Sequence, residues 1–180
     1  YTLGKSGEQV KIILLDTRYH RDQPGAKADL LGNEQWAWLE KEIKAGDADL
    51  KIVVSSIQVL SGEHDFEKWA NYPASRQRLL NLLDGEKNVL LISGDRHLAE
   101  LSKYRYPSGQ ELWDITSSGF THSFHNPDDK RNKNGLRQGP LYDRLHYGLL
   151  LIDWKKKEAV AQIHTLNGDT ALEATIPFGG

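Results

Sequence analysis

Three short apolar runs in the first half of the chain predict strands that are buried on both faces. They occupy residues 9–15 (QVKIILL), 50–57 (LKIVVSSI) and 89–92 (VLLI). Continuous apolar runs, as opposed to alternating ones, are typical of parallel sheets, in which both faces are covered. Each run is followed by polar residues, so polar side chains are expected where these strands end.

Between these runs, apolar residues recur at the spacing of amphipathic helices. The first helix is predicted over residues 32–45, with Asn33 as its N-cap. The second is predicted over residues 74–83, with Pro73 in its first turn. The order strand, helix, strand, helix, strand implies parallel strands that are joined by right-handed crossovers.

The carboxyl ends of these parallel strands should lie at one edge of the sheet. Asp16, Gln58 and Asp95 follow the three runs, so they are expected to meet at that edge. After residue 97 the pattern changes to hairpins, and residues 119–145 are expected to form a polar surface loop. Strands are predicted over residues 98–106, 110–117, 146–154, 159–166 and 171–177. The predicted fold class is therefore α/β, with a parallel β-α-β start followed by antiparallel hairpins.

Composition limits the possible functions. The 180 residues fit one domain, and a formal charge of −2 gives no reason to expect a nucleic-acid partner. No apolar run approaches the roughly 20 residues of a membrane span, and no signal-peptide pattern is present. The chain has no cysteine, which excludes thiol chemistry and leaves the compartment open. It also has no methionine, even at position 1, so we expect a processed chain or a piece of a longer one.

The best candidates for chemistry are Asp95 and His97, which follow the buried run at residues 89–92. If the chain stays extended there, side chains two residues apart point to the same side. A carboxylate and an imidazole would then form half of a metal site. The alternative is an aspartate that caps a turn beside an exposed histidine.

The other six histidines have simpler explanations. His164 lies inside an apolar strand and is expected to be structural, and His146 flanks a strand and could be either structural or functional. Four lie in predicted loops, where exposure is the default: His20, His64, His122 and His125. A serine triad is disfavoured because no G-x-S-x-G motif is present, and neither a Walker loop nor a dinucleotide fingerprint occurs.

Six motifs in order resemble those of a known family. They are LLDTRYHRD (residues 14–22), LGNEQWAWLEKEIK (31–44), VVSSIQVL (53–60), KWANYPASRQRLL (68–80), LISGDRHLAEL (91–101) and DITSSGFTHSF (114–124). Together they resemble the second half of a PhoD-like metallophosphatase, the alkaline phosphatase D family of the calcineurin-like phosphoesterase superfamily. The resemblance covers nearly the whole chain.

This resemblance implies a calcineurin-like α/β sandwich with metals at the strand ends. It implies hydrolysis of phosphate monoesters or diesters by a metal-activated hydroxide that attacks phosphorus, with iron and calcium, or other divalent pairs such as manganese or zinc. The family motif G-D-x-H makes Asp95 and His97 metal ligands. The resemblance also places Arg18 at the site, either approaching the phosphate or in a buried ion pair with Asp16, and lets His122 line the pocket.

The chain departs from the family pattern in its first ligands. The earlier Asp- and Asn-containing ligand motifs of the superfamily do not occur, and Ser56 or Gln58 stands where related enzymes have a histidine. We therefore expect residues 1–180 to be the C-terminal half of the domain, inactive alone. An N-terminal segment or a second chain would supply the remaining ligands. The alternative is a non-catalytic module that keeps the fold. Family habit suggests an exported parent protein.

Overall fold

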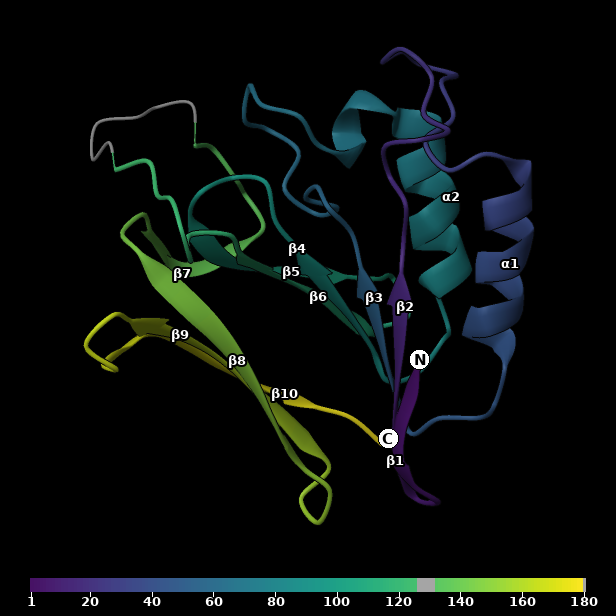
Figure 1. The fold of residues 1–180 in the computed structure, drawn as a ribbon. Coiled ribbons are helices and arrows are strands. Elements are labelled where there is room, and N and C mark those ends of the chain that lie inside the picture. Colours follow the sequence, from purple (N-terminus) through teal and green to yellow (C-terminus); the bar gives the residue numbers. More distant parts are fainter. Residues whose placement is uncertain (126–131, 180) are drawn as a thin grey trace.

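The computed structural model describes residues 1–125 and 132–179, and a seven-stranded sheet forms its centre (Figure 1). The strands are β1 Thr2–Lys5, β2 Glu8–Leu14, β3 Leu50–Val54, β4 Val89–Ser93, β5 Ala99–Arg105, β6 Glu111–Ser117 and β7 Arg137–Tyr142. They lie in the order β1-β2-β3-β4-β6-β5-β7. The pairs within β2-β3-β4-β6 are parallel, and the other pairs are antiparallel. The predicted parallel start and antiparallel continuation are confirmed.

Two helices cover one face of this sheet (Figure 1): α1 Asn33–Lys44 and α2 Pro73–Leu83, the second preceded by the short 3-10 helix η1 Trp69–Asn71. Trp36 and Trp69 are fully buried there, with ring centroids 6.3 Å apart in an edge-to-face arrangement. Pro73 occupies the first turn of α2, as predicted. The predicted N-cap of α1 is wrong by one residue, because the cap is Gly32 with a φ of 77°, a conformation that favours glycine.

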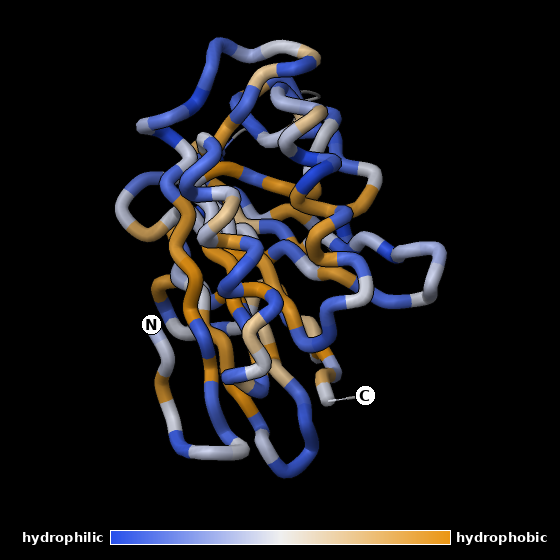
Figure 2. Tube along the Cα trace, turned by 90° about the vertical axis from the view of Figure 1, so that its right-hand side faces the viewer, coloured by the Kyte–Doolittle hydropathy of each residue, from blue (hydrophilic) through white to orange (hydrophobic). Residues whose placement is uncertain are grey.

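A three-stranded antiparallel sheet covers the opposite face, in the order β10-β9-β8. Its strands are β8 His146–Asp153, β9 Glu158–Thr165 and β10 Thr170–Pro177. Successive residues of one central strand enter different cores: Ile52 packs toward this second sheet, whereas Val53 packs toward the helices. The central strands read as continuous apolar runs because both of their faces are covered. Figure 2 shows hydrophobic segments along the strands and hydrophilic turns at their ends.

Two strands at the edges of the large sheet were not predicted. β1 lies before the first apolar run, and β7 lies within residues 119–145, so the expectation of a continuous polar loop there is wrong. Neither strand has an apolar pattern, because β1 is exposed throughout and no residue of β7 is fully buried. Residues 126–131 of the expected loop lie outside the described residues. In the described part of the chain, no helix has the length and apolar character that crossing a membrane would require.

Candidate functional site

Asp95 and His97 follow β4 at the carboxyl edge of the sheet, in a turn and not in an extended strand. Their φ angles are 70° and 55°, in the left-handed region that residues with a side chain rarely adopt. The expectation of an extended chain at this point is therefore wrong. Two hydrogen bonds hold the turn, from the Arg96 N–H to Ser118 Oγ and from the Phe124 N–H to the His97 carbonyl, both 3.1 Å. Backbone strain of this kind is concentrated at functional sites.

His122 lies against His97, although the two residues belong to different loops. Their ring centroids are 4.8 Å apart and their planes cross at 86°. The loop of His122 is fixed at Gly119, whose N–H donates to Nε2 of His146 at 3.1 Å. The Nδ1 of His146 donates to the Arg144 carbonyl at 2.7 Å, and burial lowers the pKa of His146. This buried imidazole is therefore neutral, with Nε2 available as the acceptor that holds the loop.

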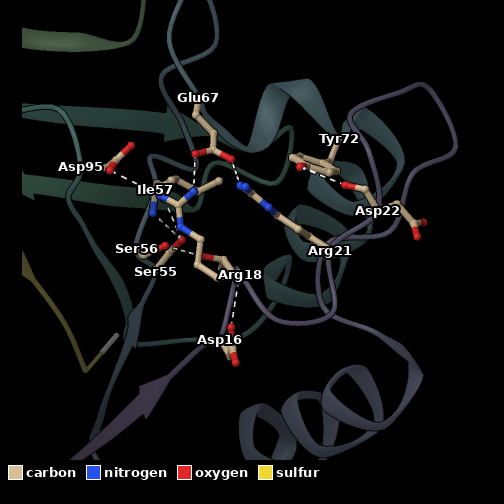
Figure 3. A network of polar contacts seen from close by, with 11 residues as sticks. Asp16, Arg18, Arg21, Asp22, Ser55, Ser56, Ile57, Glu67, Tyr72 and Asp95 are labelled. Carbon is tan, nitrogen blue, oxygen red and sulfur yellow. Dashed lines mark hydrogen bonds and ion pairs between the residues drawn. The ribbon is translucent and has the colours of Figure 1, made fainter.

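A cluster of ion pairs reaches the same edge from the loop after β2 (Figure 3). Arg18 pairs through Nη1 with one carboxylate oxygen of Glu67, and Arg21 pairs with the other. The Nη2 of Arg18 lies 3.4 Å from Oδ1 of Asp95. The geometry thus joins Arg18 to one of the two proposed metal ligands. It also brings Glu67 and Arg21 together; Arg21 lies in the polar stretch after the first apolar run, whereas the sequence did not indicate Glu67.

Asp16 has a different role from the expected buried ion pair with Arg18. It is exposed, and its Oδ1 accepts the backbone N–H groups of Tyr19 at 2.9 Å and Arg18 at 2.8 Å. These two bonds, from Tyr19 and Arg18, lower the pKa of the Asp16 carboxyl. Gln35 of α1 holds the backbone of Asp16 from the other side, since it accepts from the Asp16 N–H and donates to the Asp16 carbonyl, both at 2.8 Å. Asp16 therefore shapes the loop that presents Arg18.

Below the edge lies a buried layer of polar side chains. Asp114 of β6 is 1% exposed, and its Oδ2 accepts the N–H groups of Val59 and Leu60, both at 3.0 Å. Its Oδ1 accepts the hydroxyl of Ser93 at 2.7 Å. Burial raises the pKa of the Asp114 carboxyl. This carboxyl organises the segment after β3, away from solvent.

The side chains of Ser56 and Gln58 are held below this edge, and of their polar atoms the buried Oε1 of Gln58 has no hydrogen-bond partner among the described residues. Gln58 is buried, and its Nε2 donates to Glu100 Oε1 at 2.6 Å and to Thr116 Oγ1 at 2.8 Å. Ser56 Oγ lies 2.5 Å from the hydroxyl of the buried Thr17. Both side chains therefore contribute to the packing below the site.

The remaining histidines divide into buried and exposed ones. His64 was expected to be exposed, but it is 3% exposed and its Nδ1 accepts the Phe66 N–H at 3.1 Å. Burial lowers the pKa of His64 to about 3. His164 is structural, as expected, with Nδ1 3.0 Å from the Gly168 carbonyl in the next turn and Nε2 3.0 Å from Oε1 of Gln162 on the same strand. His20 and His125 are exposed.

The donors at this edge fit part of a metal site. Within residues 1–125 and 132–179, no three His, Asp or Glu side chains come together in a way that could hold a metal ion. Asp95 and His97 supply one carboxylate and one imidazole, which suit a hard cation and a transition metal respectively. Catalytic metal sites use three or more protein ligands. A complete site at this edge would therefore need ligands in addition to these two.

An apolar groove opens between the two sheets next to this edge. Its volume is about 400 Å³, and its lining includes Ile92, Ile115, Phe120, Tyr147 and Leu149. Phe120 is 72% exposed and Leu149 is 43% exposed. Both line the groove on the side of the molecule that carries β8. Among the described strands, β8 pairs only with β9, so its other edge has no strand beside it. The side of the large sheet that faces β8 is thus incompletely covered next to this edge.

The two sheets and the helices form an α/β sandwich similar to those of solved phosphatases. Three solved structures are similar to it: PhoD (TM-score 0.71, 18% identity), the purple acid phosphatase PPD1 from yellow lupin (Lupinus luteus) seeds (0.67, 15%) and GAP50, the anchor in the inner membrane complex of Plasmodium (0.67, 15%). The model of the PhoD-like phosphatase family matches residues 1–162. The chain belongs to the PhoD-like phosphatase family.

The comparisons also bear on how much of a domain this chain represents. The three alignments cover 98%, 98% and 100% of this chain but 40%, 32% and 53% of the respective solved chains. At these identities the likeness concerns the fold. No curated protein matches the chain.

Proposed function

We propose that this chain carries part of the active site of a metal-dependent phosphate-ester hydrolase, with Asp95 and His97 as metal ligands. The observation that supports the proposal most is that both residues occupy left-handed backbone at the carboxyl edge of the sheet, with φ angles of 70° and 55°. Asn88 and Lys157 also adopt left-handed backbone, in turns away from this edge, and what distinguishes Asp95 and His97 among these residues is that they bring metal-type donors to the carboxyl ends of the strands. A bound metal would act as a Lewis acid that activates water and neutralises phosphoryl oxygens.

The other residues of the edge would act on the substrate. Arg18 is exposed beside Asp95 and would bind a phosphoryl oxygen, because a guanidinium group matches the planar geometry of phosphate oxygens. His122 packs against His97 and would line the pocket. Iron and calcium are the proposed metals, with manganese or zinc as alternatives, and the substrate would be a phosphate monoester or diester.

We further propose that residues 1–180 correspond to the C-terminal part of the catalytic domain and that an N-terminal segment or a second chain completes the site. The partial coverage of the three solved chains supports this. The apolar groove supports it too, because Ile92 in its lining lies three residues before Asp95. A strand that occupied the groove beside β8 would end near the metal ligands.

The test is substitution of the proposed ligands in the complete enzyme. Asp95→Ala or His97→Ala should lower kcat/KM by at least roughly 100-fold and reduce metal content, while the protein stays folded. The matched control is His164→Ala, which should retain the metal. Near-normal turnover in the Asp95 or His97 variant would exclude the assignment, and loss of metal in the control would point to a different histidine.

A second candidate function is a non-catalytic module that keeps the fold. The absence of three convergent metal-type ligands among the described residues favours it for the isolated chain. Intact mass and metal analysis of the purified protein distinguish the two. A co-purifying polypeptide with stoichiometric metal supports the enzyme, and a lone chain that binds no added iron, calcium, manganese or zinc supports the module.

A further inference from the structure

The ion pairs in Figure 3 join two segments that are distant in sequence. Glu67 accepts one guanidinium on each carboxylate oxygen, from Arg18 and from Arg21. The side chains of Arg18 and Arg21 are 43% and 33% exposed. Exposed ion pairs contribute only about 0–1 kcal/mol to stability, so this arrangement is not needed to hold the fold. Its main consequence is to fix two guanidinium groups side by side next to Asp95.

From this arrangement we propose that Glu67 is a positioning residue, and that Arg18 and Arg21 together form the binding site for the phosphate group of an ester substrate. This inference rests on the proposed function, which it extends by adding Glu67 and Arg21. These three side chains sum to one net positive charge, and Asp95, which Arg18 also contacts, makes the group of four neutral in the absence of a bound cation. Paired guanidinium groups suit an anion with several oxygens, because each can donate two parallel hydrogen bonds.

The loop that carries Arg18 is fixed before any ligand binds. The side chain of Gln35 accepts the Asp16 N–H and donates to the Asp16 carbonyl, both at 2.8 Å. The Asp16 carboxylate in turn accepts the Arg18 N–H. Thr17 is 1% exposed, and its hydroxyl bonds to Ser56. An arginine on a fixed backbone loses less conformational freedom on binding, so the affinity it provides is higher.

Glu67 is fixed in the same way from its own side. The next residue, Lys68, is buried, and its Nζ donates to the Phe66 carbonyl at 3.1 Å. Trp69 follows, fully buried, with its N–H on the Gln58 carbonyl and its indole N–H on Ser55 Oγ, both at 2.9 Å. The carboxylate therefore projects from a segment that is anchored in the core.

Donor groups remain for a ligand. Each arginine contacts Glu67 through Nη1 alone. Among the described residues, Nη2 of Arg21 and the Nε atoms of both arginines donate no hydrogen bond. The Nη2 of Arg18 is engaged only at 3.4 Å, by Asp95. A cation bound to Asp95 would weaken that contact and leave Nη2 for the substrate. Phosphate held by Arg18 would then lie directly beside the proposed metal ligand.

The experiment is titration of the purified chain with inorganic phosphate, by calorimetry in the presence of a chelator, so that metal plays no part. Arg18→Lys and Arg21→Lys should each weaken binding about tenfold, because lysine cannot form the paired hydrogen bonds. The matched control is Arg78→Lys, since Arg78 also pairs with an exposed glutamate, Glu40, but lies on α2 away from the edge. The control should bind phosphate like the unaltered chain.

Glu67→Gln gives the sharpest test because two explanations predict opposite signs. If only net charge matters, removal of a carboxylate should tighten phosphate binding. If Glu67 positions the arginines, binding should weaken several-fold although the site becomes more positive. Binding that stays equal or becomes tighter, or the absence of phosphate binding to the unaltered chain, would overturn the inference. The melting temperature of the variant should stay within about 2 °C, which excludes unfolding as the cause.

Asp95→Asn separates this inference from the proposed function. It should preserve or tighten phosphate binding, because it removes the charge that competes for Arg18. If phosphate binds as described but Asp95 and His97 hold no metal in the complete enzyme, the hydrolase proposal fails and the anion site stands. If metal binding depends on Asp95 while Glu67→Gln leaves phosphate affinity unchanged, the positioning role alone fails.

Discussion

The edge of the sheet has two polar regions with opposite properties. The buried layer around Asp114 is 1% exposed at that residue, and the carboxyl has three donors on its two oxygens. The exposed tip around Asp95 and His97 has strained backbone and one long contact to Arg18 at 3.4 Å. Buried groups with hydrogen-bond partners stabilise a fold, whereas backbone strain at an exposed position costs stability. Substitutions in the two regions should therefore affect different quantities.

The largest loss of stability should follow Asp114→Ala. This change leaves the N–H groups of Val59 and Leu60 and the hydroxyl of Ser93 without their acceptor in the interior. The Ser93 hydroxyl still has Thr116 Oγ1 at 2.9 Å, so two donors are left unpaired, and at about 1–3 kcal/mol each the free energy of unfolding should fall by roughly 2–6 kcal/mol in urea titrations. Asp153→Ala is the control, because Asp153 also accepts two backbone N–H groups but is exposed to solvent. Equal effects of the two substitutions would contradict a difference between buried and exposed carboxylates.

The buried region should also make the protein sensitive to acid through His64. Its pKa is lowered from 6.5 to about 3 in the folded protein, so below pH 6.5 the unfolded chain takes up a proton that the folded chain does not. Above pH 6.5 His64 is neutral in both states, and the free energy of unfolding does not depend on its protonation. Below pH 6.5 the free energy of unfolding falls by up to about 1.4 kcal/mol per pH unit. The His64→Gln variant should lose less stability between pH 6.5 and 5, as measured by urea unfolding. The exposed His20→Gln is the control, and parallel curves for His64→Gln and the unaltered chain would contradict the prediction.

A smaller loss is expected from Gly119→Ala, at the junction of the two regions. A Cβ at this position would lie 2.2 Å from Cε1 of the His146 ring, which is rigid and buried. Overpacking of this kind costs about 1–3 kcal/mol, and it should displace the loop that carries His122. Gly46→Ala is the matched control, because no atom lies within 4 Å of a Cβ there, and its effect should be within about 0.5 kcal/mol. Thermal unfolding of both variants provides the comparison, and equal melting temperatures would show that the loop yields easily.

The smallest effect on stability, and the opposite sign, is expected at the exposed tip. His97→Gly should leave stability unchanged or raise it by up to about 1 kcal/mol, because glycine adopts a φ of 55° without strain. Lys157→Gly is a matched control, with a φ of 56° in a turn remote from the edge. If His97→Gly instead destabilised the protein by more than Lys157→Gly does, His97 would be a packing residue.

Several features of the fold and site follow from local sequence. The continuous apolar runs predicted β2, β3 and β4. Neighbouring residues such as Ile52 and Val53 enter two different cores, so successive positions of these strands are apolar. Pro73 marked the start of α2 because its fixed φ suits a first helical turn. The place of Asp95 and His97 after a buried strand also identified the edge at which chemistry is expected.

Other features depend on contacts that no local pattern records. The edge strands β1 and β7 are held by pairing with β2 and β5, so their own residues need no apolar period. The left-handed turn at Asp95 and His97 is imposed by hydrogen bonds to Ser118 and Phe124, more than 20 residues away in the sequence.

The grouping of Arg18, Arg21 and Glu67 is the clearest case of what tertiary structure alone decided. The two ion pairs span 49 and 46 residues, and a charged residue in a loop carries no signal of its partner. The sequence by itself determined the strands, the helices and the edge at which they end, because burial acts on each residue locally. Only the packed structure decided which charges meet at that edge, because the strand order brings the loops after β2 and β3 together there.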